Sequence, residues 1–252
     1  MMRKENMIIK HTRIIALDTI EMVLENEYIS QNAVPGQFLH LLLTGHMLRR
    51  PISIAQVNKQ ENTVTILFKV VGEGTRTLAS NSIGSTINAL GPSGNGFPLE
   101  PNAHSTALII GGGIGIPPLY YLANELTKKK INIVSVLGFQ SKDYVFYENK
   151  FKQLGRSIIV TNDGSYGEKG FVTNVLDQIG AFDCFYSCGP LPMLKAITTQ
   201  LKDIPGYISL EERMGCGVGA CFACVIPAVP SGGYKKICHD GPVFHTKEVQ
   251  LS

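Results

Sequence analysis

Four cysteines near the C-terminal end place the strongest constraint on what the chain can fold into. They are Cys216, Cys221, Cys224 and Cys238, spaced C-x4-C-x2-C-x13-C, and the first three lie in the stretch MGCGVGACFACVIP. This spacing matches the plant-type C-x4-C-x2-C…C pattern, in which four thiolates hold a [2Fe–2S] cluster. The interspersed glycines let such a loop wrap closely and turn backbone N–H groups towards sulfur. The sequence therefore predicts a two-iron cluster site.

Two other uses of these cysteines are considered. Structural zinc sites usually draw their ligands from two close pairs, which the x4 spacing fits less well. Disulfide bonds are rare in cytoplasmic proteins. We expect a cytoplasmic location because the charged stretch MMRKENMIIKHTRII lacks the apolar core of a signal peptide. Residues 104–124 hold no acidic residue, lysine or arginine, but their glycines and prolines indicate a strand and a loop, so we expect no membrane partner.

Composition limits the remaining classes of protein. With 252 residues, 44% of them hydrophobic and 17% charged, the chain can form one to three globular domains. The formal net charge is only +3, and Lys128–Lys130 and Lys235–Lys236 are its main basic clusters. Such clusters are typical of solvated faces, whereas nucleic-acid binding needs a broad basic stripe. We therefore expect no nucleic-acid partner.

Residues 1–102 are expected to form a β-rich first domain. Short segments rich in Ile, Val, Leu and Thr are separated by Gly, Pro, Asn and polar breaks. Strands at this spacing indicate a barrel or a sandwich. The predicted strands cover residues 8–17, 37–44, 51–57, 62–71 and 85–92.

Residues 103–208 show a different pattern, in which apolar strands alternate with helices. This alternation predicts an α/β domain with a parallel sheet. The predicted strands cover residues 106–112, 131–139, 157–163 and 182–190, and the predicted helices cover residues 117–130, 144–154, 171–179 and 192–202. Residues 209–252 show little periodicity. We therefore expect this last segment to bury little core and to need another source of stability.

The run GGGIGIPPL (111–119) lies where a strand gives way to a helix. Glycines there allow close backbone approach, and a helix N-terminus favours a phosphate. The run is not a full dinucleotide fingerprint, because Ile116 or Pro118 replaces the third glycine and no acidic residue follows about 20 positions on. A tight structural turn is the alternative.

Two stretches of the first domain also indicate binding. RRPIS (49–53) offers an arginine and a hydroxyl that can hold a pyrophosphate and a flavin edge. FKVVGEGT (68–75) offers a glycine-rich turn. Either stretch alone is equally compatible with a surface strand or a simple turn.

The order of these motifs resembles the ferredoxin–NADP reductase superfamily, in which a barrel holds FAD and an α/β domain holds NAD(P). That family usually has Arg-x-Tyr-Ser where Ile52 stands here, so an aromatic stack on the flavin is lost. With LEERMGCGVGACFACVIP…YKKICHDGPVF added, the whole chain resembles the electron-transfer subunits of NAD-dependent (class 1B) dihydroorotate dehydrogenases of pyrimidine biosynthesis. The resemblance implies an N-terminal antiparallel β-barrel, a parallel-sheet α/β domain and a small [2Fe–2S] segment.

The resemblance also implies the site residues. FAD would contact Arg50, Pro51, Ile52, Ser53, Leu67, Phe68, Lys69, Gly74 and Thr75. NAD would contact Gly113, Gly115, Pro117, Asp163, Gly164, Gly189 and Pro190. Cys188 would be a catalytic residue beside the nicotinamide, with a small packing residue as the alternative, whereas Cys184 is expected in the core. NAD over NADP rests on the resemblance alone, since Lys142 leaves a 2′-phosphate contact open.

The family works with an FMN-containing catalytic subunit, usually as a heterotetramer with two copies of each. The resemblance implies that electrons pass from dihydroorotate and the partner's FMN through the cluster and FAD to NAD. Phe222 and Val225 would form an apolar rim for that partner, or else pack inward. The alternatives are a standalone or ferredoxin-linked flavoprotein reductase and a zinc-stapled interaction module.

Overall fold

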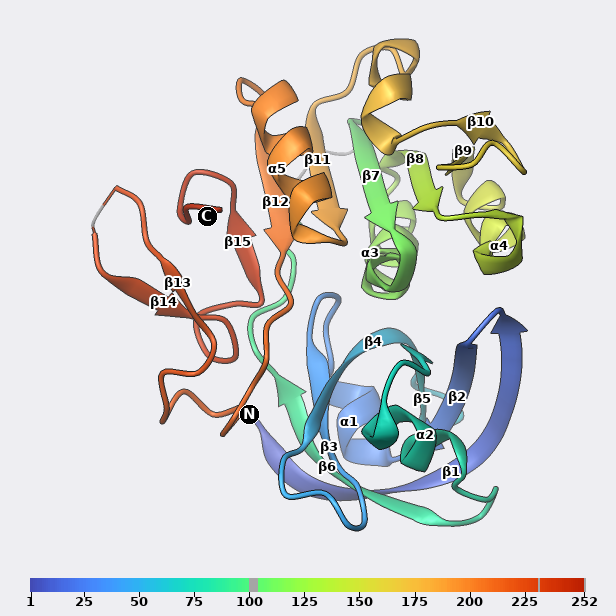
Figure 1. Ribbon diagram of the computed structural model, residues 1–252, viewed down its shortest axis with the longest axis vertical. Helices are drawn as coiled ribbons and strands as arrows, with labels where there is room; N and C mark the ends of the chain where they lie inside the picture. The colour runs from blue at the N-terminus through green and yellow to red at the C-terminus, as the bar shows by residue number, and fades with distance from the viewer. Residues whose placement is uncertain (100–103, 231, 252) are drawn as a thin grey trace.

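The computed structural model describes residues 1–99, 104–230 and 232–251. Figure 1 shows a barrel of strands, a sheet flanked by helices and a C-terminal lobe beside the sheet. The predicted fold class is therefore confirmed. The predicted domain boundary between residues 102 and 103 lies outside the described residues, and the one between 208 and 209 falls within a strand of the sheet. Both boundaries stay predictions.

Six antiparallel strands close the N-terminal barrel in the order β1-β2-β5-β4-β3-β6. Alternate side chains of a strand face opposite sides. Val64, Ile66 and Phe68 therefore enter the barrel core, whereas Leu67 packs against the α/β part. The barrel consists of β1 (Arg3–Ala16), β2 (Thr19–Glu25), β3 (Phe38–Leu42), β4 (Arg50–Asn58), β5 (Thr63–Lys69) and β6 (Thr86–Ser93), with helices α1 (Glu27–Asn32) and α2 (Glu73–Ala79).

Strand β2 is absent from the sequence prediction. Its first four residues are all buried. Met22 enters the barrel core, and Glu21 accepts a hydrogen bond from Tyr147 of the α/β part. Apart from Val23, its residues alternate between polar (Thr19, Glu21, Glu25) and apolar (Ile20, Met22, Leu24), so the local pattern of a strand is present although this strand was not predicted.

The α/β part contains a sheet in the order β10-β9-β8-β7-β11-β12-β15, parallel except at β15. The order reverses beside β7, which places β8 on one side and β11 on the other. Such a switch point opens a crevice at the carboxyl ends of the strands. The strands are β7 (Thr106–Gly112), β8 (Asn132–Phe139), β9 (Gly155–Thr161), β10 (Glu168–Lys169), β11 (Cys184–Cys188), β12 (Gly206–Ser209) and β15 (Val243–His245).

Two of the four helices predicted for this part differ in the structure. The helix expected over 144–154 is confined to five residues, because Tyr147 directly before it adopts a left-handed φ of 62°. The α-helix expected over 171–179 is instead a 3₁₀ helix, whose β-branched Val and Thr residues favour α-helix poorly. The helical elements are η1 (Gly113–Gly115), α3 (Ile116–Lys128), η2 (Lys142–Tyr144), α4 (Glu148–Lys152), η3 (Val172–Gln178) and α5 (Leu191–Gln200).

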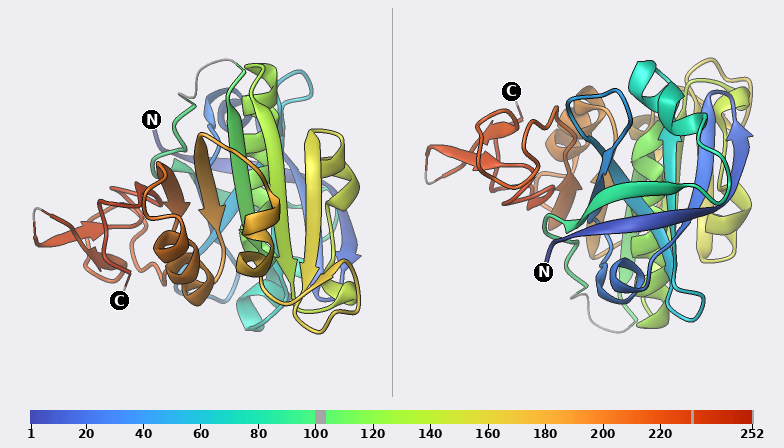
Figure 2. Two further views of the ribbon diagram at one scale, coloured as in Figure 1. Left: turned by 90° about the horizontal axis from the view of Figure 1, so that it is seen from above. Right: turned by 90° about the horizontal axis from the view of Figure 1, so that it is seen from below.

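The C-terminal lobe buries more core than its sequence pattern indicates. Its ribbon of β13 (Val225–Pro227) and β14 (Tyr234–Lys236) stands beside the end of the sheet formed by β12 and β15, as Figure 2 shows. The chain then returns as β15 and pairs with β12. Ile226, Ile237 and Phe244 join one buried cluster with Phe38 of the barrel and Ile208 of the sheet. This shared core and the added strand fix the lobe to both other parts.

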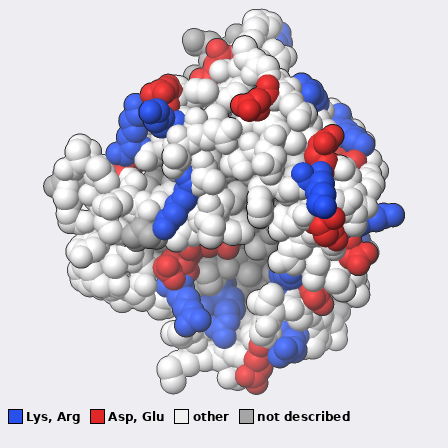
Figure 3. All heavy atoms as spheres, turned by 45° about the horizontal axis from the view of Figure 1, so that its top comes forward, with Lys and Arg blue, Asp and Glu red and all other residues white. Residues whose placement is uncertain are grey.

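On the face shown in Figure 3, lysines and arginines are interspersed with acidic side chains and separated by wide uncharged areas. Within the described residues, every helix is too short or too polar to span a membrane.

Candidate cofactor sites

The four predicted cluster ligands come together in the C-terminal lobe. Cys216, Cys221 and Cys224 lie on one irregular loop, and Cys238 follows β14. The side chain of Cys221 is a hydrogen-bonding neighbour of Cys216, and that of Cys224 is a neighbour of Cys238. All four are free thiols, so no disulfide competes for their sulfur atoms.

Backbone N–H groups of the loop point at these sulfur atoms. Cys216 Sγ accepts from the amides of Val218 at 3.4 Å and Cys221 at 3.3 Å, and Cys238 Sγ accepts from Gly219 at 3.2 Å. Gly217 and Gly219 have φ values of 69° and 80°, which other residues rarely adopt. The glycines therefore make it possible for the chain to turn its amides inward.

The loop also favours thiolate over thiol at one ligand. Burial alone raises the pKa of Cys216, but hydrogen bonds from the backbone amides outweigh it and lower that pKa to about 6. Burial and the neighbouring Cys224 raise the pKa of Cys238, so a bound cation would favour the thiolate form of Cys238. In the described ranges no three Cys, His, Asp or Glu side chains converge on one metal ion. The fit to an iron–sulfur cluster rests on the four thiols and the sulfur-directed amides.

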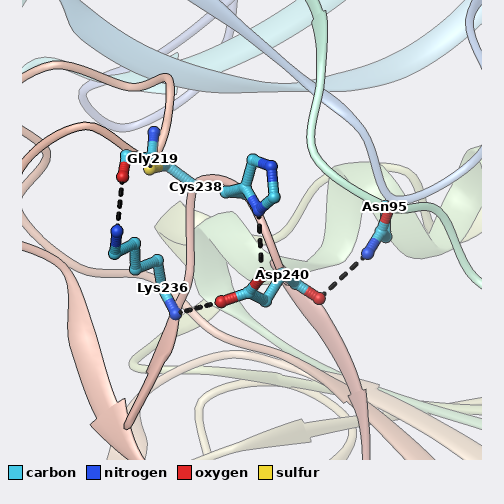
Figure 4. A network of polar contacts seen from close by, with 6 residues as sticks. Asn95, Gly219, Lys236, Cys238 and Asp240 are labelled. Carbon is cyan, nitrogen blue, oxygen red and sulfur yellow. Dashed lines mark hydrogen bonds and ion pairs between the residues drawn. The ribbon is translucent and has the colours of Figure 1, made fainter.

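A polar network ties the far ligand to the loop and to the barrel (Figure 4). Asp240 accepts a 2.7 Å hydrogen bond from the Lys236 amide, and the Asp240 carbonyl accepts one of 2.9 Å from the Asn95 side chain. The ammonium of Lys236 donates to the Gly219 carbonyl at 2.6 Å. Cys238 lies between Lys236 and Asp240 in sequence, so this network fixes its position against the loop.

We expect Asp240→Ala to loosen the cluster site without unfolding the protein. The change leaves the Lys236 amide unpaired, which costs about 1–3 kcal/mol. Iron release to a chelator should therefore become about tenfold faster, which absorbance of the chelate would follow. Asp203→Ala, at an exposed aspartate, is the matched control. Equal release rates in the two variants would show that the network does not hold the site.

Two predicted FAD-binding stretches meet in the structure. A Cβ atom on Gly74 would lie 2.5 Å from Nε of Arg50, so only glycine leaves that guanidinium in place. Arg50 is half-buried at the start of β4, and Gly74 lies in the first turn of α2. The Thr75 hydroxyl accepts from the amides of Val71 and Gly72 at 3.0 and 3.2 Å. Thr75 thus shapes the turn that carries Gly74.

The other predicted FAD residues differ in what their side chains can reach. Leu67 and Phe68 are buried in separate cores, so any flavin contact they make involves their main chain. Lys69 reaches the α/β part, where its ammonium lies 4.1 Å from the Tyr144 ring centroid. Pro51, Ile52 and Ser53 are half-buried along β4.

A cavity of about 620 Å³ lies at the carboxyl ends of the parallel strands, as expected for a nucleotide site at a switch point. Lys69 of the barrel lines it together with residues of the α/β part. Predicted NAD residues in its wall are Gly113, Gly115, Gly189 and Pro190. Residues that sequence reasoning missed include Phe139, Gln140, Tyr144, Phe146, Phe171, Met193 and Glu211.

Three other predicted residues lie away from the cavity wall. Pro117 is buried in α3, and Asp163 and Gly164 occupy an exposed turn in which Asp163 Oδ1 accepts from the Ser165 amide at 3.0 Å. Cys184 is buried, as predicted. Cys188 is also fully buried, and this burial raises the pKa of its thiol. Its assignment as a catalytic residue stays a prediction.

Glu211 is the acidic residue of the cavity wall. It follows β12 and is exposed at the cavity, and partial loss of water around its carboxyl group raises its pKa. Its charge also contributes, after burial, to the raised pKa of Cys188, so the two groups are close neighbours. In the sequence Glu211 lies in the stretch LEERMGCGVGACFACVIP that carries the family resemblance, but nothing there marked it as a residue of the nucleotide cavity.

We expect Gly115→Ala to damage the cavity wall. A Cβ atom there would lie 2.4 Å from the carbonyl oxygen of Cys188, and this contact with backbone has no easy relief. The free energy of unfolding should fall by about 1–3 kcal/mol, measured by denaturant titration. Gly72→Ala, where no atom lies within 4 Å of the new Cβ, is the control. Equal stabilities would mean that the close approach is not as tight as described.

Comparison with known proteins shows which family the chain is similar to. Residues 211–250 match the family described as the iron–sulfur cluster binding domain of dihydroorotate dehydrogenase B. The chain is 51% identical over 259 aligned positions to the electron transfer subunit of dihydroorotate dehydrogenase B (NAD(+)) of Bacillus cereus strain B4264. It is 50% identical to the subunit of the same name from Bacillus anthracis strain CDC 684. Both alignments cover 100% of both chains.

Solved structures support the same architecture. The chain superimposes on an NADH-dependent reduced ferredoxin-NADP oxidoreductase with a TM-score of 0.88 and 32% identity, over 97% of this chain and 90% of the other. A cytochrome P450 reductase of Amycolatopsis has a TM-score of 0.71 and 20% identity, over 80% of this chain and 66% of the other. The similarity to the Amycolatopsis reductase, at 20% identity, shows the fold alone.

Proposed function

Since the chain belongs to the family of electron transfer subunits of NAD-dependent dihydroorotate dehydrogenase B, we propose that it carries electrons from a catalytic partner to NAD. The subunit is an oxidoreductase component that uses FAD, a [2Fe–2S] cluster and NAD. In the partner, dihydroorotate loses two electrons and two protons to FMN and becomes orotate. A cluster held by the four cysteines would pass the two electrons singly, and a bound FAD would collect them and supply a hydride to NAD.

The observation that carries this proposal is the shared wall of the nucleotide cavity. Lys69 ends the predicted flavin strand β5 and lines the same cavity as Gly113 and Gly189. A nicotinamide and a flavin edge bound there would share one space. Flavin exchanges one or two electrons, nicotinamide accepts only a hydride and the cluster accepts one electron, so flavin has to stand between the other two.

The chain's own residues bind and orient these groups. We assign Cys216, Cys221, Cys224 and Cys238 as cluster ligands, with the loop amides stabilising their negative charge. Arg50, held beside Gly74, is assigned to the FAD pyrophosphate. The glycine turn before α3 is assigned to NAD, because its amides and the helix dipole favour a phosphate.

The partner would dock over the cluster loop. Phe222 lies between two ligand cysteines and is 70% exposed, with the Lys236 ammonium 4.6 Å from its ring centroid. Val225 is half-buried on β13. An exposed aromatic ring beside a redox centre suits an anchor residue of an interface. We propose two copies of each subunit in the complex, in the cytoplasm, where reducing conditions keep the cysteines free for iron.

A standalone reductase is the second candidate, favoured by the TM-score of 0.88 to a ferredoxin-NADP oxidoreductase. The two candidates differ in their need for a partner. The purified chain should reduce dyes with NADH but should not oxidise dihydroorotate until an FMN-containing dihydroorotate dehydrogenase subunit is added. Dihydroorotate oxidation by the chain alone, or no gain on adding that subunit, would contradict the proposal.

A further inference from the structure

His40 lies where the barrel meets the cluster loop. It is fully buried in the middle of β3, and its register partner in β4 is Pro51, within the proposed flavin-binding stretch. Its ring packs edge-on against Phe38 at a centroid distance of 6.4 Å. A polar side chain in this position needs an explanation, because its neighbours on the same strand are apolar.

Neither ring nitrogen of His40 makes a hydrogen bond of normal geometry among the described residues; the backbone of Arg49 is a polar neighbour of the ring but lies outside that geometry. A buried polar group without a partner is costly and rare in a folded protein. Burial and the charge of Arg49 lower the pKa of His40 to about 4, so the ring is neutral at pH 7. A neutral imidazole carries one N–H donor and one acceptor nitrogen. The ring therefore has hydrogen-bonding capacity that the described residues leave unfilled by normal geometry.

The cluster loop is the part of the chain that faces this ring. A Cβ atom on Gly217 would lie only 2.1 Å from Nδ1 of His40, so the ring packs directly on the Gly217 backbone. Gly217 follows the ligand Cys216 and precedes Val218, whose amide donates to Cys216 Sγ. Nδ1 of His40 thus lies beside the segment that surrounds the proposed cluster.

We propose that the ring N–H of His40 donates a hydrogen bond to a sulfur atom of the cluster unit and thereby raises the cluster's reduction potential. This inference rests on the proposed cluster site. The reduced cluster carries one more negative charge than the oxidised one, so a donor at sulfur stabilises the reduced form more. His40 is then a tuning residue that comes from the barrel rather than from the cluster loop.

The test compares His40→Leu with His40→Gln in the full chain loaded with FAD and iron. The cluster midpoint potential is measured by a redox titration followed by electron paramagnetic resonance. In His40→Leu the equilibrium constant for cluster reduction should fall about tenfold, which is about 59 mV for a one-electron couple. His40→Gln keeps an N–H donor and should recover most of that loss.

A neighbouring core change separates tuning from packing. Leu41→Ala, at a fully buried apolar position of the same strand, should destabilise the fold but leave the cluster potential unchanged. An unchanged potential in His40→Leu, or an equal fall in all three variants, would overturn the inference. A chain without iron in the unaltered protein would instead overturn the cluster assignment, so the two failures are distinguishable.

A second measurement needs no change at His40. With ¹⁵N-labelled histidine, pulsed electron paramagnetic resonance of the reduced cluster should detect a weakly coupled ring nitrogen. The coupling should persist in His239→Gln, which removes the exposed ring next to Cys238. Loss of the coupling in that variant, or no coupling in the unaltered protein, would contradict the role of His40.

Discussion

Cys224→Ala should abolish NADH production by the complex with its catalytic partner. Changes to groups that merely support a ligand cost about 10–100-fold, so removal of a buried ligand should cost at least about 100-fold. Dye reduction by NADH should survive, because that reaction needs FAD but no cluster. The measurement is steady-state NADH formation from dihydroorotate, with iron and FAD counted in the same sample.

Cys184→Ala is the matched control for this prediction. Cys184 is also a buried free cysteine, but it lies in β11 within the α/β core and outside the cluster spacing. Its replacement should leave NADH formation close to normal. If NADH formation continues in Cys224→Ala after the iron has been lost, electrons reach FAD by a route that bypasses the cluster.

Arg50→Gln should weaken FAD binding by about 10–100-fold. A hydrogen bond to a charged group contributes about 1.5–3 kcal/mol, and glutamine keeps a donor but loses the charge. Flavin fluorescence during titration of the FAD-depleted chain measures the affinity. The cluster should load normally in this variant, since its ligands lie in a different part of the fold.

The glycine pair in VGEGT gives this prediction an internal control. Gly74→Ala places a methyl group 2.5 Å from Arg50 Nε, and the flexible arginine can move away at little cost in stability. FAD affinity should therefore fall while the free energy of unfolding changes little. Gly72→Ala has free space around its Cβ and should bind FAD normally. Equal affinities in the two variants would remove Arg50 from the FAD site.

The sequence revealed those parts of the fold that follow from local pattern. Alternating apolar strands and helices predicted the parallel sheet, and short strands with turn residues predicted the β-rich first domain. Strand β2 was not predicted, although its residues alternate between polar and apolar except at Val23. Strand β15 was hidden because its three residues join the sheet only through pairing with β12, far away in sequence.

The candidate sites likewise contain some residues that a local sequence signal predicts and others that only tertiary packing brings together. Cysteine spacing is a local signal, so the four predicted ligands could be named from the sequence together with the glycines beside them. The meeting of Arg50 with Gly74, and of Gly115 with Cys188, depends on tertiary packing that no spacing encodes. No motif marks the role of His40 or Glu211, and only the burial of His40 and the place of Glu211 in the cavity wall single them out.

The central claim is the order nicotinamide, flavin, cluster within this chain. It is tested most directly by mixing the Arg50→Gln chain anaerobically with NADH, once nearly free of FAD and once with saturating FAD. The paramagnetic signal of the reduced cluster should appear only in the FAD-saturated sample, after the flavin absorbance has bleached. A cluster that NADH reduces equally fast without FAD would contradict the account.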